Sequence, residues 1–76
     1  MRVTRSARRH RIGNAHIRAA LLSAVLVDST GDQFLYVGMD DRGVELELIL
    51  VPDDRYPGDF AVIHAMPTAF RRKDEP

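Results

Sequence analysis

The chain has 76 residues, 45% of them hydrophobic and 29% charged, and this length predicts one small domain spanning 1–76. It contains no cysteine, which excludes disulfides and thiolate metal sites, and its apolar runs are far shorter than the ~20 residues of a membrane span. No apolar stretch follows the N-terminal arginines, so we expect a cytoplasmic protein that makes no membrane contact.

The formal net charge is zero, but the charges are segregated along the chain. Residues 1–27 carry six arginines and no acid, residues 28–59 have a net charge of −7, and residues 60–76 have +1. A chain polarised in this way can present a basic surface to phosphate groups while another surface is acidic. The neutral total therefore does not exclude a nucleic acid as partner.

Two helices are predicted near the N-terminus. Ser6 is a candidate N-cap for a first helix over residues 7–11, which Gly13 interrupts. Asn14 is a candidate N-cap for a second helix from Ala15 to about Ala24, in which apolar side chains recur at helical spacing.

After residue 25 the sequence has the alternation and turn residues of strands. Strands are predicted over residues 34–38, 44–51 and 60–66, with residues 25–27 as an optional short one. Short loops between consecutive strands favour antiparallel pairing. The sequence thus predicts an α+β fold with two N-terminal helices packed on a three- to four-stranded antiparallel sheet, an ordered core over about 6–67, and flexible ends.

His64 lies in an otherwise apolar strand and has two interpretations. It is either a buried side chain with a hydrogen-bond partner or a functional group on an uncovered sheet face. Arg71 and Arg72 follow this strand, and Arg9 and His10 lie in the first predicted helix. A histidine that transfers protons beside guanidinium groups that bind phosphate is the minimum set for cleaving RNA without a metal.

Other polar residues have simpler explanations. Turn chemistry accounts for the Asp40–Asp41 and Asp53–Asp54 pairs, and Tyr36 either stacks on a base or packs against its neighbours. His10 and His16 are six residues apart, which does not place them on one helix face. We therefore predict no metal site and no cofactor.

Four segments resemble small BrnT-like toxins of the RelE superfamily, which are ribonuclease components of bacterial type II toxin–antitoxin systems. The segments are Arg8–Ile12, Tyr36–Gly43, Leu46–Leu50 and Val62–Pro67, within a resemblance that covers roughly residues 6–67. The resemblance implies a RelE-like fold, an mRNA target on or off the ribosome, and a cognate antitoxin protein as partner.

The candidate site residues form two groups. The candidate catalytic residues are His64 and Arg42, which the resemblance implies because they match its motif positions, and Arg71 and Arg72, which follow the last strand. The candidate RNA-binding residues are Arg8, Arg9, His10, Arg11, Arg18 and Lys73.

Two alternatives to an endoribonuclease stay open. In the first, the same basic segment only binds nucleic acid or an acidic protein, which predicts salt-sensitive binding without a cleavage product. In the second, the chain is an assembly partner whose basic helices dock on an acidic peptide.

Overall fold

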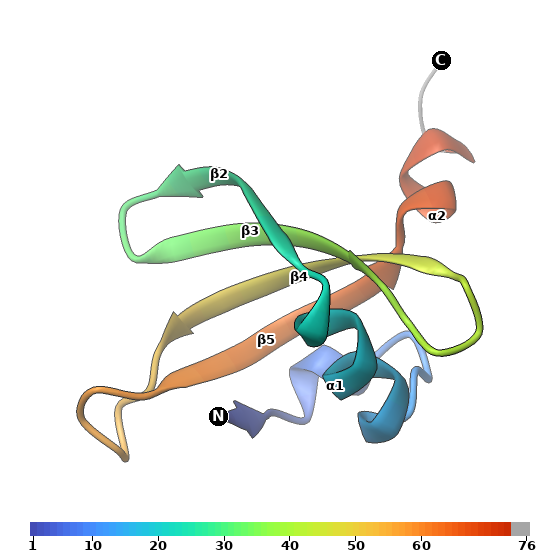
Figure 1. Cartoon of the computed structure of the whole chain (residues 1–76). Coiled ribbons are helices and arrows are strands. Elements are labelled where there is room, and N and C mark those ends of the chain that lie inside the picture. Colours follow the sequence, from blue (N-terminus) through green and yellow to red (C-terminus); the bar gives the residue numbers. More distant parts are fainter. Residues whose placement is uncertain (74–76) are drawn as a thin grey trace.

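The computed structural model describes residues 1–73, with side chains as far as Arg71. In chain order, the elements are β1 (Arg2–Val3), the 3-10 turn η1 (Ser6–Arg8), α1 (Asn14–Leu22), β2 (Val25–Thr30), β3 (Gln33–Met39), β4 (Glu45–Pro52), β5 (Phe60–Pro67) and α2 (Thr68–Lys73). The strands form one sheet in the order β1-β5-β4-β3-β2 (Figure 1). Strand β1 runs parallel to β5, and the other neighbours are antiparallel. Within residues 1–73, no helix has the length and hydropathy needed to cross a membrane.

The predicted RelE-like arrangement of two N-terminal helices on an antiparallel sheet is wrong. The sheet is mixed and five-stranded, and α1 is the one helix of seven or more residues in the described part of the chain. The first predicted helix is replaced by η1, in which Ala7 is the buried residue, so there is no apolar stripe to stabilise a longer helix. Arg8 and Arg11 also place like charges three residues apart, and Arg11 leaves the helical region with φ 60°.

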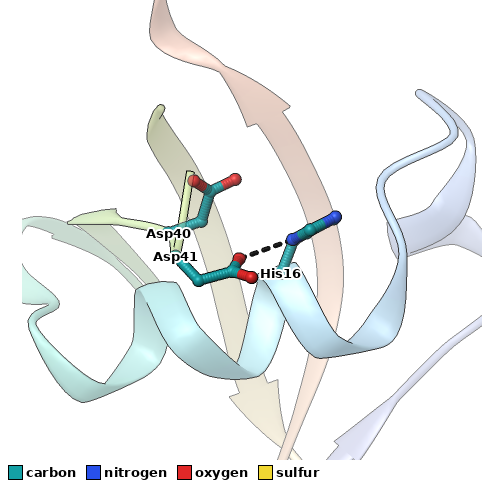
Figure 2. Close-up of side chains that lie close together, drawn as sticks. All are labelled: His16, Asp40 and Asp41. Carbon is teal, nitrogen blue, oxygen red and sulfur yellow. Dashed lines mark hydrogen bonds and ion pairs between the residues drawn. The ribbon is translucent and has the colours of Figure 1, made fainter. Parts of the chain in front are cut away.

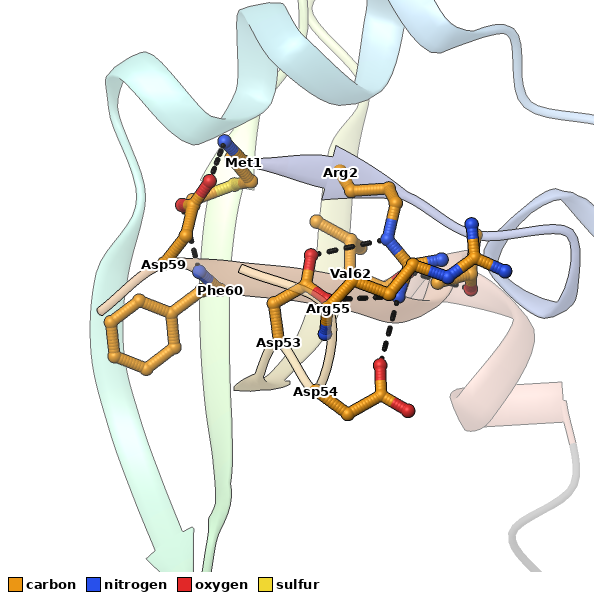
Figure 3. Close-up of polar contacts among 9 residues, drawn as sticks. Met1, Arg2, Asp53, Asp54, Arg55, Asp59, Phe60 and Val62 are labelled. Atoms are coloured by element: carbon orange, nitrogen blue, oxygen red, sulfur yellow. Dashed lines mark hydrogen bonds and ion pairs between the residues drawn. The ribbon is translucent and has the colours of Figure 1, made fainter. Parts of the chain in front are cut away.

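Strand β1 lies in a segment that was expected to be flexible. Arg2 and Val3 pair with Ala61 and Val62 of β5. Arg2 holds this strand in place by donating from Nε and Nη2 to the two carboxylate oxygens of Asp53, at 3.1 Å each (Figure 3). A two-residue strand is too short to show a periodic pattern, and its partner is nearly sixty residues away in the sequence, so local reasoning misses it.

The alternation along β4 separates the two faces of the sheet. Leu46, Leu48 and Leu50 are buried in a core that α1 and η1 cover, together with Ala7, Ile12, Ile17, Ala20, Val62 and Ala65. Tyr36 packs against this core, which agrees with the packing interpretation of its ring. The other residues of β4, including Glu47 and Ile49, point to the opposite side of the sheet, which we call the open face.

Candidate functional site

A histidine and a glutamate are hydrogen-bonded on the open face. In the β4–β5 pairing, His64 lies opposite Ile49 and Met66 lies opposite Glu47, so His64 and Glu47 are diagonal neighbours. The Nε2 atom of His64 lies 2.9 Å from Oε2 of Glu47. The Glu47 side chain is 5% exposed and that of His64 is 27% exposed. The carboxylate is therefore shielded from solvent, whereas the imidazole is still accessible.

Arg71 completes the bonding of this carboxylate. Helix α2 begins directly after β5 and is attached to β4 by a hydrogen bond of 2.7 Å from the Thr68 hydroxyl to Glu45. Arg71 then reaches Glu47 with Nε 3.1 Å from Oε1 and Nη2 3.2 Å from Oε2. This forked contact leaves the other guanidinium N–H groups of Arg71, which is 55% exposed, available for an anion.

A second histidine lies against the first. The ring centroids of His10 and His64 are 5.8 Å apart with the rings nearly perpendicular, and the His10 ring lies 6.2 Å from the Phe70 ring of α2. His10 stands in a tight turn in which the Arg11 N–H donates to the carbonyl of Arg8 at 3.0 Å. The turn that follows η1 thus places His10 beside β5.

The arrangement has the parts needed for proton transfer. When Nε2–H of His64 donates to Glu47, the neutral imidazole keeps its lone pair on Nδ1, which has no hydrogen-bond partner among the described residues. Nδ1 can therefore accept a proton from a ligand, while Glu47 holds the ring and its tautomer. His10 supplies a second group that can exchange a proton, and Arg71 supplies positive charge.

The structure brings three of the predicted site residues together: His64, Arg71 and His10. Arg42 is not among them. It lies in the β3–β4 hairpin, where it donates to the buried carboxylate of Asp40 at 2.6 and 2.9 Å. Ile49 is the residue of β4 that pairs with His64, and it lies four residues after the start of that strand at the hairpin. The hairpin end of β4 is therefore about 13 Å along the strand from the level of His64.

The predicted RNA-binding arginines of the N-terminal region are all exposed, but they lie at different distances along the chain from His10. Arg8, Arg9 and Arg11 are exposed, flank His10, and make no side-chain ion pair within the part of the chain that the structure describes. Arg18 is exposed on α1, which covers the other face, so it lies away from His64. The predicted roles of Arg72 and Lys73 depend on side chains that lie outside the described residues.

Sequence reasoning missed Glu47 and Phe70 as parts of this site. Alternation along β4 places Glu47 on the polar face of the strand, but only the strand register shows that this face also carries His64. The available signal was a pair of glutamates that alternate with leucines in the strand, and that pattern is equally typical of a solvated surface.

His16, Asp40 and Asp41 are the described residues whose ligand atoms are close enough for a metal ion, all within 4.8 Å (Figure 2). Asp40 is already fully bonded, because Arg42 donates to one oxygen and two backbone N–H groups donate to the other. Burial raises the pKa of Asp40, but these donors outweigh it and keep the pKa below its ordinary value of 3.8. The His16–Asp41 contact ties α1 to the hairpin, so we interpret the group as structural.

A scan against protein-family models, a search of curated proteins and a search of solved structures found no match to this chain.

Proposed function

We propose that the chain is a metal-independent endoribonuclease that cleaves single-stranded RNA on the open face of its sheet. The observation that carries this proposal is the contact of His64 with both Glu47 and the His10 ring, beside Arg71. Two adjacent imidazoles can supply a general base and a general acid, and a guanidinium group can stabilise the charge that develops on phosphorus during RNA transesterification.

In the proposed reaction, Nδ1 of His64 takes the proton of the 2′-hydroxyl, and the 2′-oxygen attacks the adjacent phosphorus. His10 gives a proton to the 5′-oxygen as the P–O5′ bond breaks, and the products are a 2′,3′-cyclic phosphate and a free 5′-hydroxyl. The free N–H groups of Arg71 stabilise the charge on the phosphorane. Arg8, Arg9 and Arg11 are exposed neighbours of His10 in the chain, and we assign to them the binding of flanking phosphates.

The resemblance to BrnT-like toxins supports a cellular role for this activity. The chain then acts on mRNA in the bacterial cytoplasm, on or off the ribosome, and a cognate antitoxin blocks the open face. Induced expression in a bacterial host should arrest growth, and co-expression of the neighbouring reading frame should relieve the arrest. Full growth with the chain alone would contradict the toxin assignment.

The test of the chemistry compares the three histidines of the chain. Purified protein is incubated with a labelled single-stranded RNA in EDTA, and the products are separated by length and by end group. Because proton transfer by a positioned side chain contributes about 10²–10⁴-fold, His64→Ala and His10→Ala should each lower the cleavage rate at least 100-fold. His16→Ala, on the other side of the sheet, should change it less than twofold.

Two controls make the result decisive. A substrate with 2′-deoxyribose at the cleaved position should resist cleavage, because it lacks the nucleophile. Thermal unfolding of each variant shows whether a lost rate reflects a lost fold. Undiminished cleavage by a folded His64→Ala variant would overturn the proposal.

A non-enzymatic nucleic-acid-binding module is the second candidate, and the exposed arginines around His10 favour it. It predicts RNA binding that weakens steeply with salt, with no product from the unsubstituted chain. The same incubation, followed by a binding measurement, therefore separates the two candidates.

A further inference from the structure

A second feature of the open face is a pocket beside the His64–Glu47 pair. Its volume is about 160 Å³, and its lining includes Asp28, Thr30, Gln33, Leu35, Ile49 and Arg71. Pockets that bind drug-sized ligands have volumes of about 300 Å³ or more, and this pocket has roughly half of that volume. Its size therefore suits a single planar ring system. We call it the base pocket.

The strand register aligns the base pocket with His64. Asp28 pairs with Leu35, Leu35 with Ile49, and Ile49 with His64, so these four residues form one row across β2, β3, β4 and β5. Neighbouring strands lie about 4.8 Å apart, which places the Leu35–Ile49 floor about 5–10 Å from His64. A single nucleotide can span this distance from its base to its phosphate.

Two β-bulges give this row its polar ends. In β2 the register shifts between Leu26 and Asp28, so that Asp28 takes the place opposite Leu35 that Val27 would hold in a regular ladder. In β5 the shift beside Ile49 omits Ile63 and places His64 in the row. Bulges of this kind re-aim side chains and are frequent next to active sites. Both ends of the row therefore carry a polar group in place of an aliphatic one.

The chemistry of the base pocket matches a nucleobase. Leu35 and Ile49 provide an apolar floor for the face of a ring, while Asp28 and Gln33 provide polar groups at the end away from His64. Among the four RNA bases, guanine alone presents two adjacent N–H donors and a carbonyl on its Watson–Crick edge. Oδ1 of Asp28 already accepts from the Ser29 N–H at 2.8 Å, but each carboxylate oxygen can accept more than one hydrogen bond, so the two oxygens can still match the donors, and an amide N–H matches the carbonyl.

Arg71 connects the base pocket to the reaction site. Arg71, whose guanidinium contacts Glu47, is also one of the residues that line the pocket. It can therefore contact the phosphate of a nucleotide whose base is in the pocket.

We propose that the base pocket holds a guanine of the RNA, with Asp28 accepting from its N1 and N2 groups and Gln33 donating to its O6. This proposal rests on the proposed function, because it assigns the base next to the phosphate that His64 and Arg71 face. It makes Asp28 and Gln33 specificity-determining residues and predicts cleavage beside guanosine.

Binding tests the pocket without any catalysis. The four nucleoside 3′-monophosphates are titrated into the protein and followed by NMR chemical shifts. We expect guanosine 3′-monophosphate to bind at least tenfold more tightly than the other three, and Asp28→Asn to remove this preference. Asp32→Asn, in the turn of the same hairpin but outside the pocket lining, should preserve it. Equal binding of the four nucleotides, or equal behaviour of the two variants, would overturn the guanine assignment.

Cleavage separates this proposal from the one on which it rests. Asp28→Asn should lower the rate beside guanosine at least tenfold relative to the other bases. The His64→Ala variant should cleave at least 100-fold more slowly and still bind guanosine 3′-monophosphate. If the unsubstituted chain binds guanine selectively but yields no product, the endoribonuclease fails and the pocket stands. Cleavage without preference for guanosine overturns the pocket and leaves the endoribonuclease in place.

Discussion

At the residue scale, the position of His10 depends on the backbone of its neighbour Arg11. Arg11 has φ 60°, a left-handed conformation that raises the free energy of a residue with a side chain by about 1–2 kcal/mol. Glycine adopts this conformation without strain. Backbone strain of this kind is concentrated at functional sites, which agrees with the role that we assign to His10.

A pair of glycine substitutions tests this strain. Arg11→Gly removes about 1–2 kcal/mol of backbone strain from the folded state, but the greater backbone entropy of glycine stabilises the unfolded chain by about 1 kcal/mol. Because these two effects oppose each other, the free energy of unfolding should change by less than about 1 kcal/mol. Arg5→Gly removes the same charge at φ −59° and should only destabilise, by about 0.5–1 kcal/mol. Urea denaturation measures both changes. Arg11→Gly clearly less stable than Arg5→Gly would show that the left-handed conformation is not strained.

The sequence left two interpretations of His64 open, and the structure combines them. His64 has a buried hydrogen-bond partner in Glu47, as expected of a structural histidine, and it is still accessible on the open face. The two interpretations are compatible because one ring nitrogen can bond the protein while the other faces a ligand.

At the element scale, α1 lies so close to β3 that one residue of the strand must be a glycine. A Cβ atom on Gly38 would lie 2.1 Å from the carbonyl oxygen of Ala20 and 3.0 Å from the Cα atom of Ala24. The end of the helix is also bonded to the strand, because the Ser23 hydroxyl accepts from the Met39 N–H at 3.0 Å and donates to its carbonyl at 3.2 Å. The two atoms of α1 that a Cβ on Gly38 would meet are both backbone atoms, so the helix backbone would have to shift to make room for it.

Gly38→Ala should therefore be strongly destabilising. Overpacking costs about 1–3 kcal/mol when side chains can adjust, and here the obstacle is backbone, so we expect a loss of at least about 3 kcal/mol in urea denaturation. Gly13→Ala is the matched control, because its Cβ would meet only the His16 ring at 3.8 Å. It should change the free energy of unfolding by less than about 1 kcal/mol. Similar values for both variants would contradict the close approach of α1.

Sequence patterns predicted the elements with clear periodicity and missed those that depend on pairing. The strands around residues 34–38, 44–51 and 60–66 and the helix from about residue 15 are present. The first helix was overpredicted, since capping and composition favoured it while no apolar stripe supported it. The two bulges that align Asp28 and His64 leave no local signal, because a register shift exists only between two strands.

At the scale of the whole molecule, three aspartates at loop positions make stability dependent on pH. The pKa of Asp53 is lowered by Arg2 and by the Arg55 N–H, and that of Asp59 by the N-terminal amino group and the Phe60 N–H (Figure 3). The pKa of Asp40 is also low, as described above. All three therefore lie below the value of 3.8 expected in the unfolded chain.

Because the folded pKa values are the lower ones, these carboxylates contribute stability that is fully present above pH 3.8 and is lost as the pH falls through the folded values. We expect the melting temperature to hold between about pH 7 and 5 and to fall steadily toward pH 3 and below. Asp53→Asn should lower the melting temperature at pH 7 and make the acid-induced fall shallower. Asp32→Asn, an exposed turn residue, should leave the curve unchanged. A melting temperature that rises on acidification would contradict the assignment.

The sequence by itself determined the alternation of β4, the segregation of charge, and the choice of histidine and arginine as candidate groups, because these depend on residue type and short spacing. Only the tertiary structure decided which of them meet. His10, Glu47, His64 and Arg71 come from four separate segments, and their contacts depend on strand register, two bulges and the turn at Arg11. Arg42 does not join them, since its partner is the buried Asp40 of its own hairpin. Contacts between distant segments follow from the packing of the whole chain, and short-range patterns do not encode them.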